Sequence, residues 1–249
     1  MSLNNLESSR RTRVLVASIV GAALLAGAFI VSSSNDAQAE PAVLAKKKTE
    51  VLGAIGKLPE PQCPMNCEAL AIVSGFQAEI DDVGNPYRIP YNGFITKWKL
   101  SLGSVDKEQR TFFEENFGSK PKAQLSVLKP VKVNGRRQYK LQRRSPVVGL
   151  NKYLGKVASI GLDKRIPVKK GWYVALTVAT WAPALAFVET KSGNPDPDFN
   201  WRASREKNTC DKKPNMNTSE PQQKVNSKRS YGCRFDGAQL LYRVKVTNK

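Results

Sequence analysis

Histidine is absent from all 249 residues of the sequence. Histidine is the most frequent general base, the commonest metal ligand and the only side chain whose ordinary pKa lies between pH 5 and 8. Its absence excludes Ser-His-Asp and Cys-His catalysis and histidine-based metal hydrolysis. A Ser-Lys dyad or a pair of carboxylates needs no imidazole, so these two chemistries stay open.

The sequence also lacks any spacing that singles out a catalytic pair of carboxylates. We therefore interpret its acidic side chains as solvated surface groups, which is their usual state. The acids that could form a pair are Glu79, Asp81 and Asp82 on one side and Glu114, Glu115, Asp196 and Asp198 on the other. Oxygen-bearing side chains alternate over residues 194–200, as Ca²⁺ would use, but the glycine and terminal glutamate of a known calcium loop are missing. No catalytic residue, metal site or cofactor is predicted.

Cysteine is scarce, with four residues in the chain. A four-cysteine zinc site needs two close pairs, and only Cys63 and Cys67 are close in sequence. In an exported chain, four cysteines predict two disulfides, for which three pairings exist. We favour Cys63 with Cys67 and Cys210 with Cys233. The second bond would hold in place a long polar loop, residues 192–232, that shows little apolar periodicity.

The N-terminal segment has the arrangement of an export signal. Three arginines within residues 10–13 lead into an uncharged apolar run, residues 14–31, and small residues precede position 40. This predicts a signal peptide, residues 1–39, cleaved after Ala39. The alternative is an uncleaved anchor, because the apolar run is about 27 Å long as a helix, close to the thickness of a bilayer core. We expect a secreted or cell-surface protein, with membrane attachment only through residues 14–31.

Acidic residues are few relative to basic ones. The chain has 40 Lys and Arg against 21 Asp and Glu, a net charge of +19. Outside the cytoplasm such a field favours phosphate-bearing or uronic-acid polymers. A solubilising role is the alternative, since the charges are spread along the chain rather than blocked. The expected partner is an anionic cell-wall polymer or polysaccharide, and no nucleic acid is expected.

Short strands dominate the predicted secondary structure. Residues 40–62 predict a flexible linker, with a weak helix at 47–57. Apolar and polar residues alternate over 94–102 and again over 238–246, which is typical of half-buried antiparallel strands. The remaining predicted elements are strands at 69–80, 123–129, 138–142, 157–162, 172–180 and 184–189, and a helix at 107–117.

These elements predict a single all-β domain at residues 63–249. The regular spacing of short strands and turns favours an antiparallel β-sandwich, jelly-roll-like, with a short helix and a long disulfide-tied loop.

The four tryptophans fall into two groups. Trp98 and Trp172 lie on apolar faces of predicted strands, where core packing is expected. The other two lie in proline- and asparagine-containing loops, where a flat ring could stack on a sugar. Two arginines follow the second of these rings closely and add positive charge. The predicted ligand-binding residues are Trp181, Trp201, Arg202 and Arg205.

Several short motifs together carry a resemblance. They are Cys63-Pro64-Met65-Asn66-Cys67, Asn85-Pro86-Tyr87-Arg88-Ile89-Pro90 with Gly93, Trp98, Leu102-Gly103, Arg144-Ser145-Pro146-Val147-Val148, Thr180-Trp181-Ala182-Pro183-Ala184, Trp201-Arg202-Ala203-Ser204-Arg205 and Tyr231-Gly232-Cys233-Arg234. In this order they resemble a group of exported proteins of high-GC Gram-positive bacteria. The resemblance covers most of residues 63–246 and implies an exported jelly-roll-like domain, with no activity or catalytic residue attached.

The sequence therefore favours a non-enzymatic binding module for anionic or saccharide components of the cell envelope. Two alternatives stay open. A carboxylate-based glycan-cleaving enzyme would need two acids about 5 to 9.5 Å apart in a cleft. A purely structural surface protein would have no pocket joining its aromatic loops.

Overall fold

The computed structural model describes residues 46–58, 69–212 and 221–249. Among these residues, one α-helix lies between the fourth and fifth strands of the chain. The elements up to residue 153 are β1 (Thr49–Leu52), β2 (Leu70–Ile80), β3 (Val83–Gly84), β4 (Gly93–Ser101), α1 (Lys107–Phe117), β5 (Lys122–Val133), β6 (Arg136–Arg144), β7 (Val148–Gly149) and the 3-10 turn η1 (Asn151–Tyr153). The remaining elements are β8 (Val157–Val168), β9 (Tyr173–Ala182), β10 (Leu185–Phe187), β11 (Asn200–Ala203), η2 (Lys207–Thr209), β12 (Lys228–Arg229), β13 (Cys233–Asp236), β14 (Ala238–Leu240) and β15 (Tyr242–Thr247).

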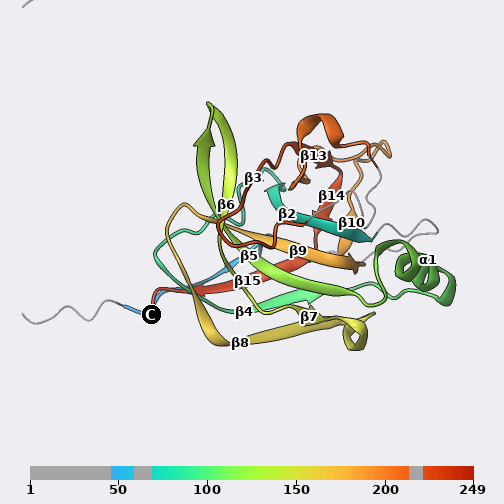
Figure 1. The fold of residues 1–249 in the computed structure, drawn as a ribbon, viewed down its shortest axis with the longest axis horizontal. Helices are drawn as coiled ribbons and strands as arrows, with labels where there is room; N and C mark the ends of the chain where they lie inside the picture. Colours follow the sequence, from blue (N-terminus) through green and yellow to red (C-terminus); the bar gives the residue numbers. More distant parts are fainter. Residues whose placement is uncertain (1–45, 59–68, 213–220) are drawn as a thin grey trace, which may run out of the picture. The chain divides into compact units, whose positions relative to one another are not determined.

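Antiparallel pairing joins these strands into two main sheets. The smaller sheet has the order β1-β15-β4-β8. The larger has the order β12-β6-β5-β9-β2-β11-β13, with β3 paired to β2 and β7 to β5. β10 and β14 form a separate pair. Figure 1 shows the two main sheets as stacked layers with α1 beside one end. The predicted antiparallel all-β sandwich is confirmed.

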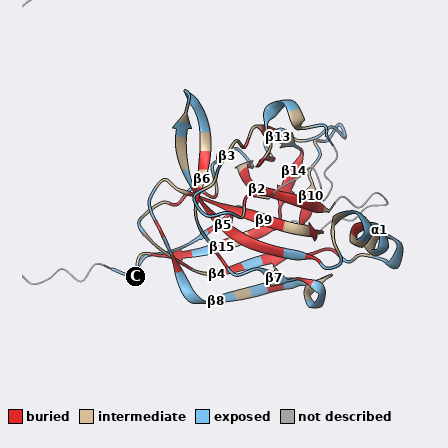
Figure 2. Ribbon diagram, in the orientation of Figure 1, coloured by how far each residue is buried: buried red, intermediate tan, exposed pale blue. Residues whose placement is uncertain are grey.

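The main core lies between these two sheets. Both sheets supply it, with Trp98 and Leu100 on β4 facing Leu125 on β5 and Leu176 on β9 within one cluster of buried side chains. Figure 2 shows the buried residues concentrated in the central strands, among them β2, β5 and β9. Removal of this much apolar surface from water is the largest favourable contribution to folding.

Two stacked tyrosines link the core to the turn after β3. The rings of Tyr87 and Tyr242 lie 4.0 Å apart, and both are fully buried. Each hydroxyl donates to a backbone carbonyl, Tyr87 to Tyr242 and Tyr242 to Val174. Buried hydroxyls need such partners. Burial raises the pKa of both phenols well above its ordinary value.

A capping box begins the helix that sequence predicted. The Asp106 side chain accepts from the Gln109 backbone N–H at 2.8 Å, and the Gln109 side chain accepts in return from the Asp106 backbone at 3.1 Å. Such reciprocal bonds satisfy two backbone donors that an open helix end would leave free. Phe113 is the buried residue of this helix. It packs on Trp181 of β9, with ring centroids 5.1 Å apart.

The fold begins earlier in the chain than predicted. Residues 47–57 do not form a helix, because β1 lies within them and pairs with β15. Leu52 at the end of β1 is buried in the main core. This corrects the boundary of the predicted linker, residues 40–62: in the described part of that segment, 46–58, a strand belongs to the sandwich. The proposed signal and anchor, residues 1–39 and 14–31, lie outside the described residues, as does the Cys63–Cys67 pair.

A bulge changes which face of β4 is buried. The alternation predicted that Phe94 and Thr96 share the inner face with Trp98. The register instead shifts between Ile95 and Lys97. A bulge inserts one residue and moves the residues before it to the other face. Ile95 is consequently fully buried and Phe94 is not.

The polar segment at residues 192–232 is less irregular than predicted. It contains β11, which lies between β2 and β13 in the larger sheet. The predicted disulfide between Cys210 and Cys233 is present and joins the end of η2 to the start of β13. Thus a strand of the sheet, as well as the disulfide, holds this segment.

Candidate functional site

Strand β11 separates the predicted ligand residues onto two faces of the larger sheet. Trp201 and Ala203 belong to the core between the sheets. Arg202, between them, lies opposite Phe76 of β2, which belongs to a second cluster on the outer face. Adjacent residues of a strand point to opposite sides. Trp201 therefore lines an apolar cavity on the inner side of β11, and Arg202 lines a cleft on the outer side.

Trp181 belongs to neither cavity, and its predicted position in a loop is wrong. It lies on β9 rather than in a loop, and its side chain has no exposed surface. Its indole N–H donates to the Gly118 carbonyl at 3.0 Å. Proline at position 183 suggested a loop, but the strand ends just before it, and the ring packs beneath helix α1.

An arginine cleft of about 600 Å³ occupies the outer face of the larger sheet. Its floor consists of Phe76, Tyr139 and Tyr231, three of the rings of the outer cluster. Three arginines from three strands line it above these rings. The charged and polar residues of this arginine cleft are Arg137, Arg202, Arg234, Glu79, Asn85, Asn200 and Ser230.

Two of these arginines are direct neighbours across the sheet. Arg202 on β11 pairs in register with Arg234 on β13. Like charges directly opposite each other on adjacent strands are destabilising. Arg234 is compensated by Asp236, with the guanidinium Nε and the carboxylate oxygen 2.6 Å apart. Arg202 has no hydrogen bond or ion pair within the described residues, although its side chain is only partly exposed.

The third arginine lies beside a buried phenol. Burial raises the pKa of the Tyr139 hydroxyl, and the charges of Arg137 and Arg202 act in the opposite direction. Both guanidinium groups are therefore close enough to Tyr139 for their electric fields to matter. Glu79, the acid among the described residues of this cleft, already accepts a hydrogen bond from Asn200 at 2.8 Å. Positive charge dominates the arginine cleft.

A buried polar network fixes the chain segment on one side of this cleft. The Gln222 backbone N–H donates to Ser74 at 2.9 Å, and its side-chain amide donates to the carbonyls of Tyr139 and Ser227. Tyr231 donates its hydroxyl to the Gln222 amide oxygen at 2.9 Å. With every bond made, such a network specifies a single arrangement. It holds Tyr231, and the strand that follows, against the larger sheet.

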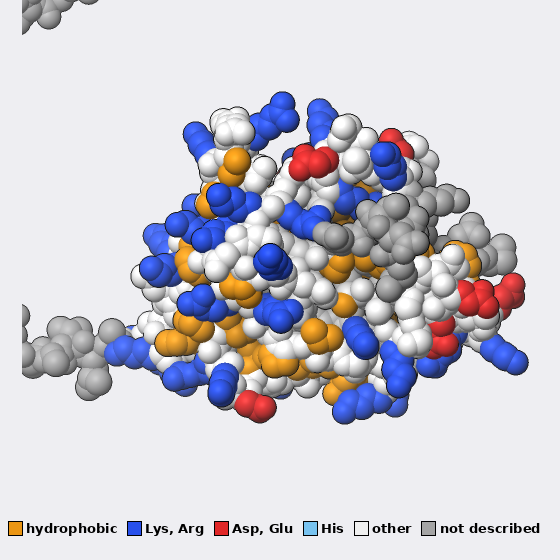
Figure 3. Space-filling view, in the orientation of Figure 1, with side chains coloured by type: hydrophobic (Ala, Val, Ile, Leu, Met, Phe, Trp, Pro, Cys, Tyr) orange, Lys and Arg blue, Asp and Glu red, His pale blue; other side chains and the backbone are white. Residues whose placement is uncertain are grey.

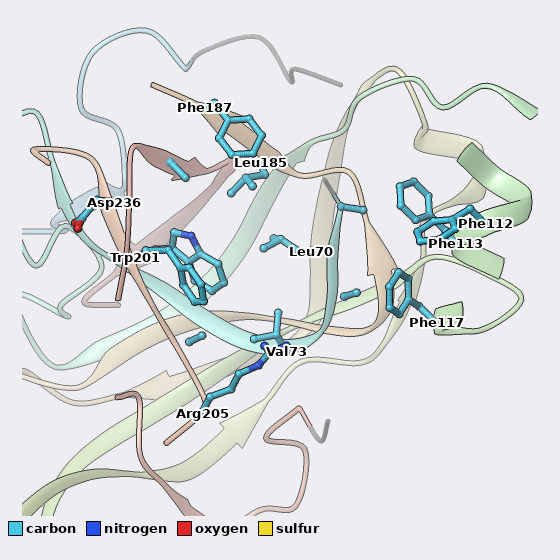
Figure 4. Close-up of a pocket in the computed structure, with 15 residues that line it drawn as sticks. Leu70, Val73, Phe112, Phe113, Phe117, Leu185, Phe187, Trp201, Arg205 and Asp236 are labelled. Carbon is cyan, nitrogen blue, oxygen red and sulfur yellow. The ribbon is translucent and has the colours of Figure 1, made fainter. Parts of the chain in front are cut away.

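An apolar cavity of about 380 Å³ lies on the inner side of β11, at the end of the sandwich next to α1. Figure 4 shows the rings of the helix on one side of it and Trp201 on the other, with Leu185 and Phe187 above. The residues that line this apolar cavity are Ala69, Leu70, Ala71, Val73, Phe112, Phe113, Phe117, Leu185, Phe187, Trp201, Ala203, Arg205, Phe235, Asp236 and Ala238.

Trp201 forms a flat wall of the apolar cavity because Phe235 packs on its ring and Gly75 leaves room for it. Its ring stacks on Phe235 with centroids 4.8 Å apart. On its other flank is Gly75, where a Cβ atom would lie 2.7 Å from the indole carbons. Any larger residue at position 75 would push the ring aside. Trp201 is 7% exposed, so the indole borders the cavity while remaining part of the core.

Arg205 brings a positive charge to this apolar cavity. Its guanidinium donates to the Lys212 carbonyl at 3.1 Å and forms no ion pair within the described residues. Burial lowers the pKa of Arg205, because desolvation disfavours the charged form. Asp236, the acid among the described lining residues, is paired with Arg234. Within the described part of the chain, the apolar cavity thus holds one cation without an acidic partner.

Five of the acidic candidates from the sequence lie near one another, around the end of β2 and the start of β11, whereas Glu114 and Glu115 lie on α1. The pKa of Asp198 is raised, chiefly by the charge of Asp82, and also by those of Asp196, Glu79 and Asp81. They do not share a cavity, however: among the described residues, Glu79 is the acid that lines the arginine cleft and Asp236 the acid that lines the apolar cavity. Within the described residues no group of three His, Cys, Asp or Glu side chains is placed to hold a metal ion.

Lysine and arginine are spread widely over the surface. Figure 3 shows them over the β5–β6 hairpin and along the β8 side, with acidic side chains confined to a few places. This distribution agrees with the charge pattern read from the sequence. No helix among the described residues is long and apolar enough to cross a membrane.

Comparisons with protein-family models, curated proteins and solved structures gave no match. The resemblance to exported proteins of high-GC Gram-positive bacteria therefore stays a prediction.

Sequence reasoning missed most of the residues that complete the two cavities. Arg137 and Arg234 were visible as basic residues, but only the strand register places them beside Arg202. The three phenylalanines of α1 lie within the helix predicted at residues 107–117, but the sequence alone does not place them at a cavity. Two of them, Phe113 and Phe117, do pack on neighbouring rings, while Phe112 is 53% exposed at the cavity.

Proposed function

We propose that this protein is an exported, non-enzymatic binding module that holds an anionic component of the cell envelope in its arginine cleft. The observation that carries the proposal is Arg202. Its charge is partly withdrawn from water, directly opposite another arginine, with no acidic partner in the described chain. An arrangement that costs stability is expected at a functional site, where a ligand supplies the missing charge.

Guanidinium groups suit carboxylate and phosphate ligands. Each presents a planar fork of N–H donors that can bind two oxygens of an anion at once. Arg137, Arg202 and Arg234 could bind successive anionic groups of a polymer or one multiply charged group. The cleft of about 600 Å³ is within the range of ligand sites. The positive field of the whole chain would concentrate a polyanion near this surface.

Binding across a salt series tests the proposal. We would measure binding of the purified protein to polygalacturonate, to polyphosphate and to neutral dextran between about 20 and 300 mM salt, where screening becomes strong. We expect both polyanions to bind, with part of the affinity retained at the higher salt, and dextran to bind weakly or not at all. Polyanion binding that disappears completely at moderate salt would indicate a diffuse charge effect and contradict the cleft.

Matched variants separate the cleft from the general charge. Arg202→Gln removes one cation from the cleft, and Lys99→Gln removes one from an exposed position on β4 in the other sheet. We expect Arg202→Gln to weaken polyanion binding about tenfold, as for loss of a charge-assisted hydrogen bond, and Lys99→Gln to have a much smaller effect. Equal effects of the two variants would contradict the proposed site. Absence of binding at any salt would favour a purely structural role.

A further inference from the structure

The apolar cavity on the inner side of β11 has two features, apolar walls and one nearby positive charge, that a single ligand could match. Its walls are aliphatic and aromatic, formed by residues such as Leu70, Leu185 and Trp201. A single arginine, Arg205, approaches it, and in Figure 4 that side chain extends toward Val73. We propose that this cavity binds the hydrocarbon chain of an anionic amphiphile, whose carboxylate or phosphate pairs with Arg205. This proposal is independent of the anion site in the arginine cleft.

The lining favours a hydrocarbon chain over a sugar. Sugar hydroxyls lose their hydrogen bonds to water on entering a cavity and need polar partners there. Apart from backbone groups and the indole N–H of Trp201, the described lining of this cavity offers only Arg205 and Asp236 as polar groups, and Asp236 is committed to Arg234. A hydrocarbon chain needs no such partners and gains from leaving water. The volume of about 380 Å³ is at the small end of ligand pockets, consistent with one chain.

The charge favours an acidic headgroup over a neutral or cationic one. Arg205 is partly buried, and burial lowers its pKa, which shows that its charge is poorly solvated. It has no carboxylate partner within the described residues, and its one described hydrogen bond goes to the Lys212 carbonyl. A carboxylate or phosphate beside it would replace the lost water contacts with charge-assisted hydrogen bonds. A cationic headgroup would be repelled.

Helix α1 forms part of the rim of the cavity, which a hydrocarbon chain would pass as it enters. Phe112 is 53% exposed although it lines the cavity. It contacts Phe113 and Phe117 edge-on, with ring centroids 5.8 and 6.0 Å away. An exposed aromatic ring at the entrance of an apolar cavity adds contact area for the part of a chain that is still outside.

A headgroup series on one chain length tests the proposal. The probes are dodecanoate, dodecyl phosphate, dodecanol and dodecyltrimethylammonium, each below its micelle concentration, with binding to the purified protein measured by calorimetry. We expect both anions to bind at least tenfold more tightly than the cation, and dodecanol to fall between them. The difference between dodecanoate and dodecyl phosphate distinguishes a fatty-acid ligand from a phosphate headgroup. Equal binding of the cation and the anions, or absence of binding, would overturn the proposal.

Two variants test whether Arg205 is the group that selects an anionic headgroup. Arg205→Gln keeps most of the side chain but removes the charge, and Lys207→Gln removes a charge from a nearby exposed position outside the cavity. We expect Arg205→Gln to weaken dodecanoate binding about tenfold and to leave dodecanol binding unchanged. Lys207→Gln should leave both unchanged. If Arg205→Gln does not fold, the headgroup series on the unaltered protein still decides the question.

Methyl resonances locate the bound chain. We expect dodecanoate to shift the methyl signals of Leu70, Val73 and Leu185, which line the cavity, and not those of Leu128 and Leu141, which lie in the outer cluster. Shifts confined to the outer cluster would contradict the location. Because polygalacturonate has no hydrocarbon chain and dodecanol no charge, failure of this proposal can be distinguished from failure of the anion site in the arginine cleft.

Discussion

Arg202 and Arg234 face each other across neighbouring strands, as a registered pair in the antiparallel ladder between β11 and β13. An arginine pair in that position repels, and among the described residues only Arg234 has an acidic partner, Asp236. A protein selected for stability alone gains nothing from this arrangement. A bound anion would bridge the two guanidinium groups and reverse the sign of their interaction.

We therefore expect stability and binding to respond in opposite directions at this pair. Arg202→Gln should leave the free energy of unfolding unchanged or raise it by up to about 1 kcal/mol, because a cross-strand repulsion is removed, while polyanion binding weakens. Urea unfolding measured without ligand checks the first effect, and a binding titration the second. A variant that loses stability and binding together would show that Arg202 has a structural role instead.

Trp181 should matter for folding and not for binding. Trp181→Phe removes the hydrogen bond to Gly118 and part of a fully buried ring, so we expect a loss of about 2 kcal/mol in the free energy of unfolding. Trp172→Phe changes a half-buried indole next to β9 and is the matched control, with a smaller expected loss. Polyanion binding at a temperature where both variants are folded should be unaltered. Weakened binding would return Trp181 to the list of ligand residues.

The comparison of these tryptophans shows which features local sequence could predict. Hydrophobic periodicity and turn residues are local signals, so the all-β class, most strands and helix α1 followed from them. Burial of Trp181 depends on a helix more than sixty residues earlier in the chain, which no local pattern contains. The bulge in β4 likewise reflects pairing with β8.

The two cavities depend even more on pairing between distant segments. The sequence singles out Arg202 as a charged residue beside an aromatic one, but its cleft partner Arg137 comes from a hairpin on the far side of the sheet order. Trp201 and Arg205 do share a cavity, which their even spacing of four residues could have suggested if the chain stays extended past the end of β11 at Ala203. Polar residues surround β11 in the sequence, so the apolar alternation that would predict a strand is not visible there.

Strand β1 should contribute to stability although it precedes Cys63. Leu52→Ala removes a side chain that is 3% exposed and packs in the main core, so we expect a loss of about 2 to 3 kcal/mol in the free energy of unfolding. Val51→Ala, on the 42% exposed neighbour, should change it by no more than about 0.5 kcal/mol. Chemical unfolding of the two variants checks this. Equal, small effects would restore the view of this segment as a linker.

The Cys210–Cys233 bond should stabilise the fold and the arginine cleft together. It restricts the unfolded chain across the segment between β11 and β13, and in the chain-entropy model such a loop contributes about 3 kcal/mol. We expect the Cys210→Ala/Cys233→Ala variant to lose about that much stability and to bind polyanions more weakly, since Arg234 directly follows Cys233. Unfolding and binding curves on the oxidised parent and the variant are the measurement. Unchanged stability would mean that β11 pairing and the Gln222 network hold the segment without the disulfide.

Alkaline pH should unfold the protein cooperatively, because three tyrosines are buried in the core and the outer cluster. Burial raises the pKa of Tyr87, Tyr231 and Tyr242 above the ordinary value near 10. Below pH 10 these phenols are protonated in both states, and the stability is fully present. As the pH rises above 10, the unfolded state loses protons that the folded state retains, so the free energy of unfolding falls by about 1.4 kcal/mol per tyrosine for each pH unit.

With three such groups the fall is about 4 kcal/mol per unit, and a stability of about 5 to 15 kcal/mol would be exhausted within a few units above pH 10. We would follow tyrosinate absorbance at 295 nm together with circular dichroism during an alkaline titration, with the urea-unfolded chain as reference. We expect the late part of the tyrosinate signal to appear together with loss of the β-sheet signal, and Tyr231→Phe to make the fall in stability with pH less steep. Complete ionisation near pH 10 with the sheet signal intact would show that these hydroxyls are open to solvent, contrary to their burial.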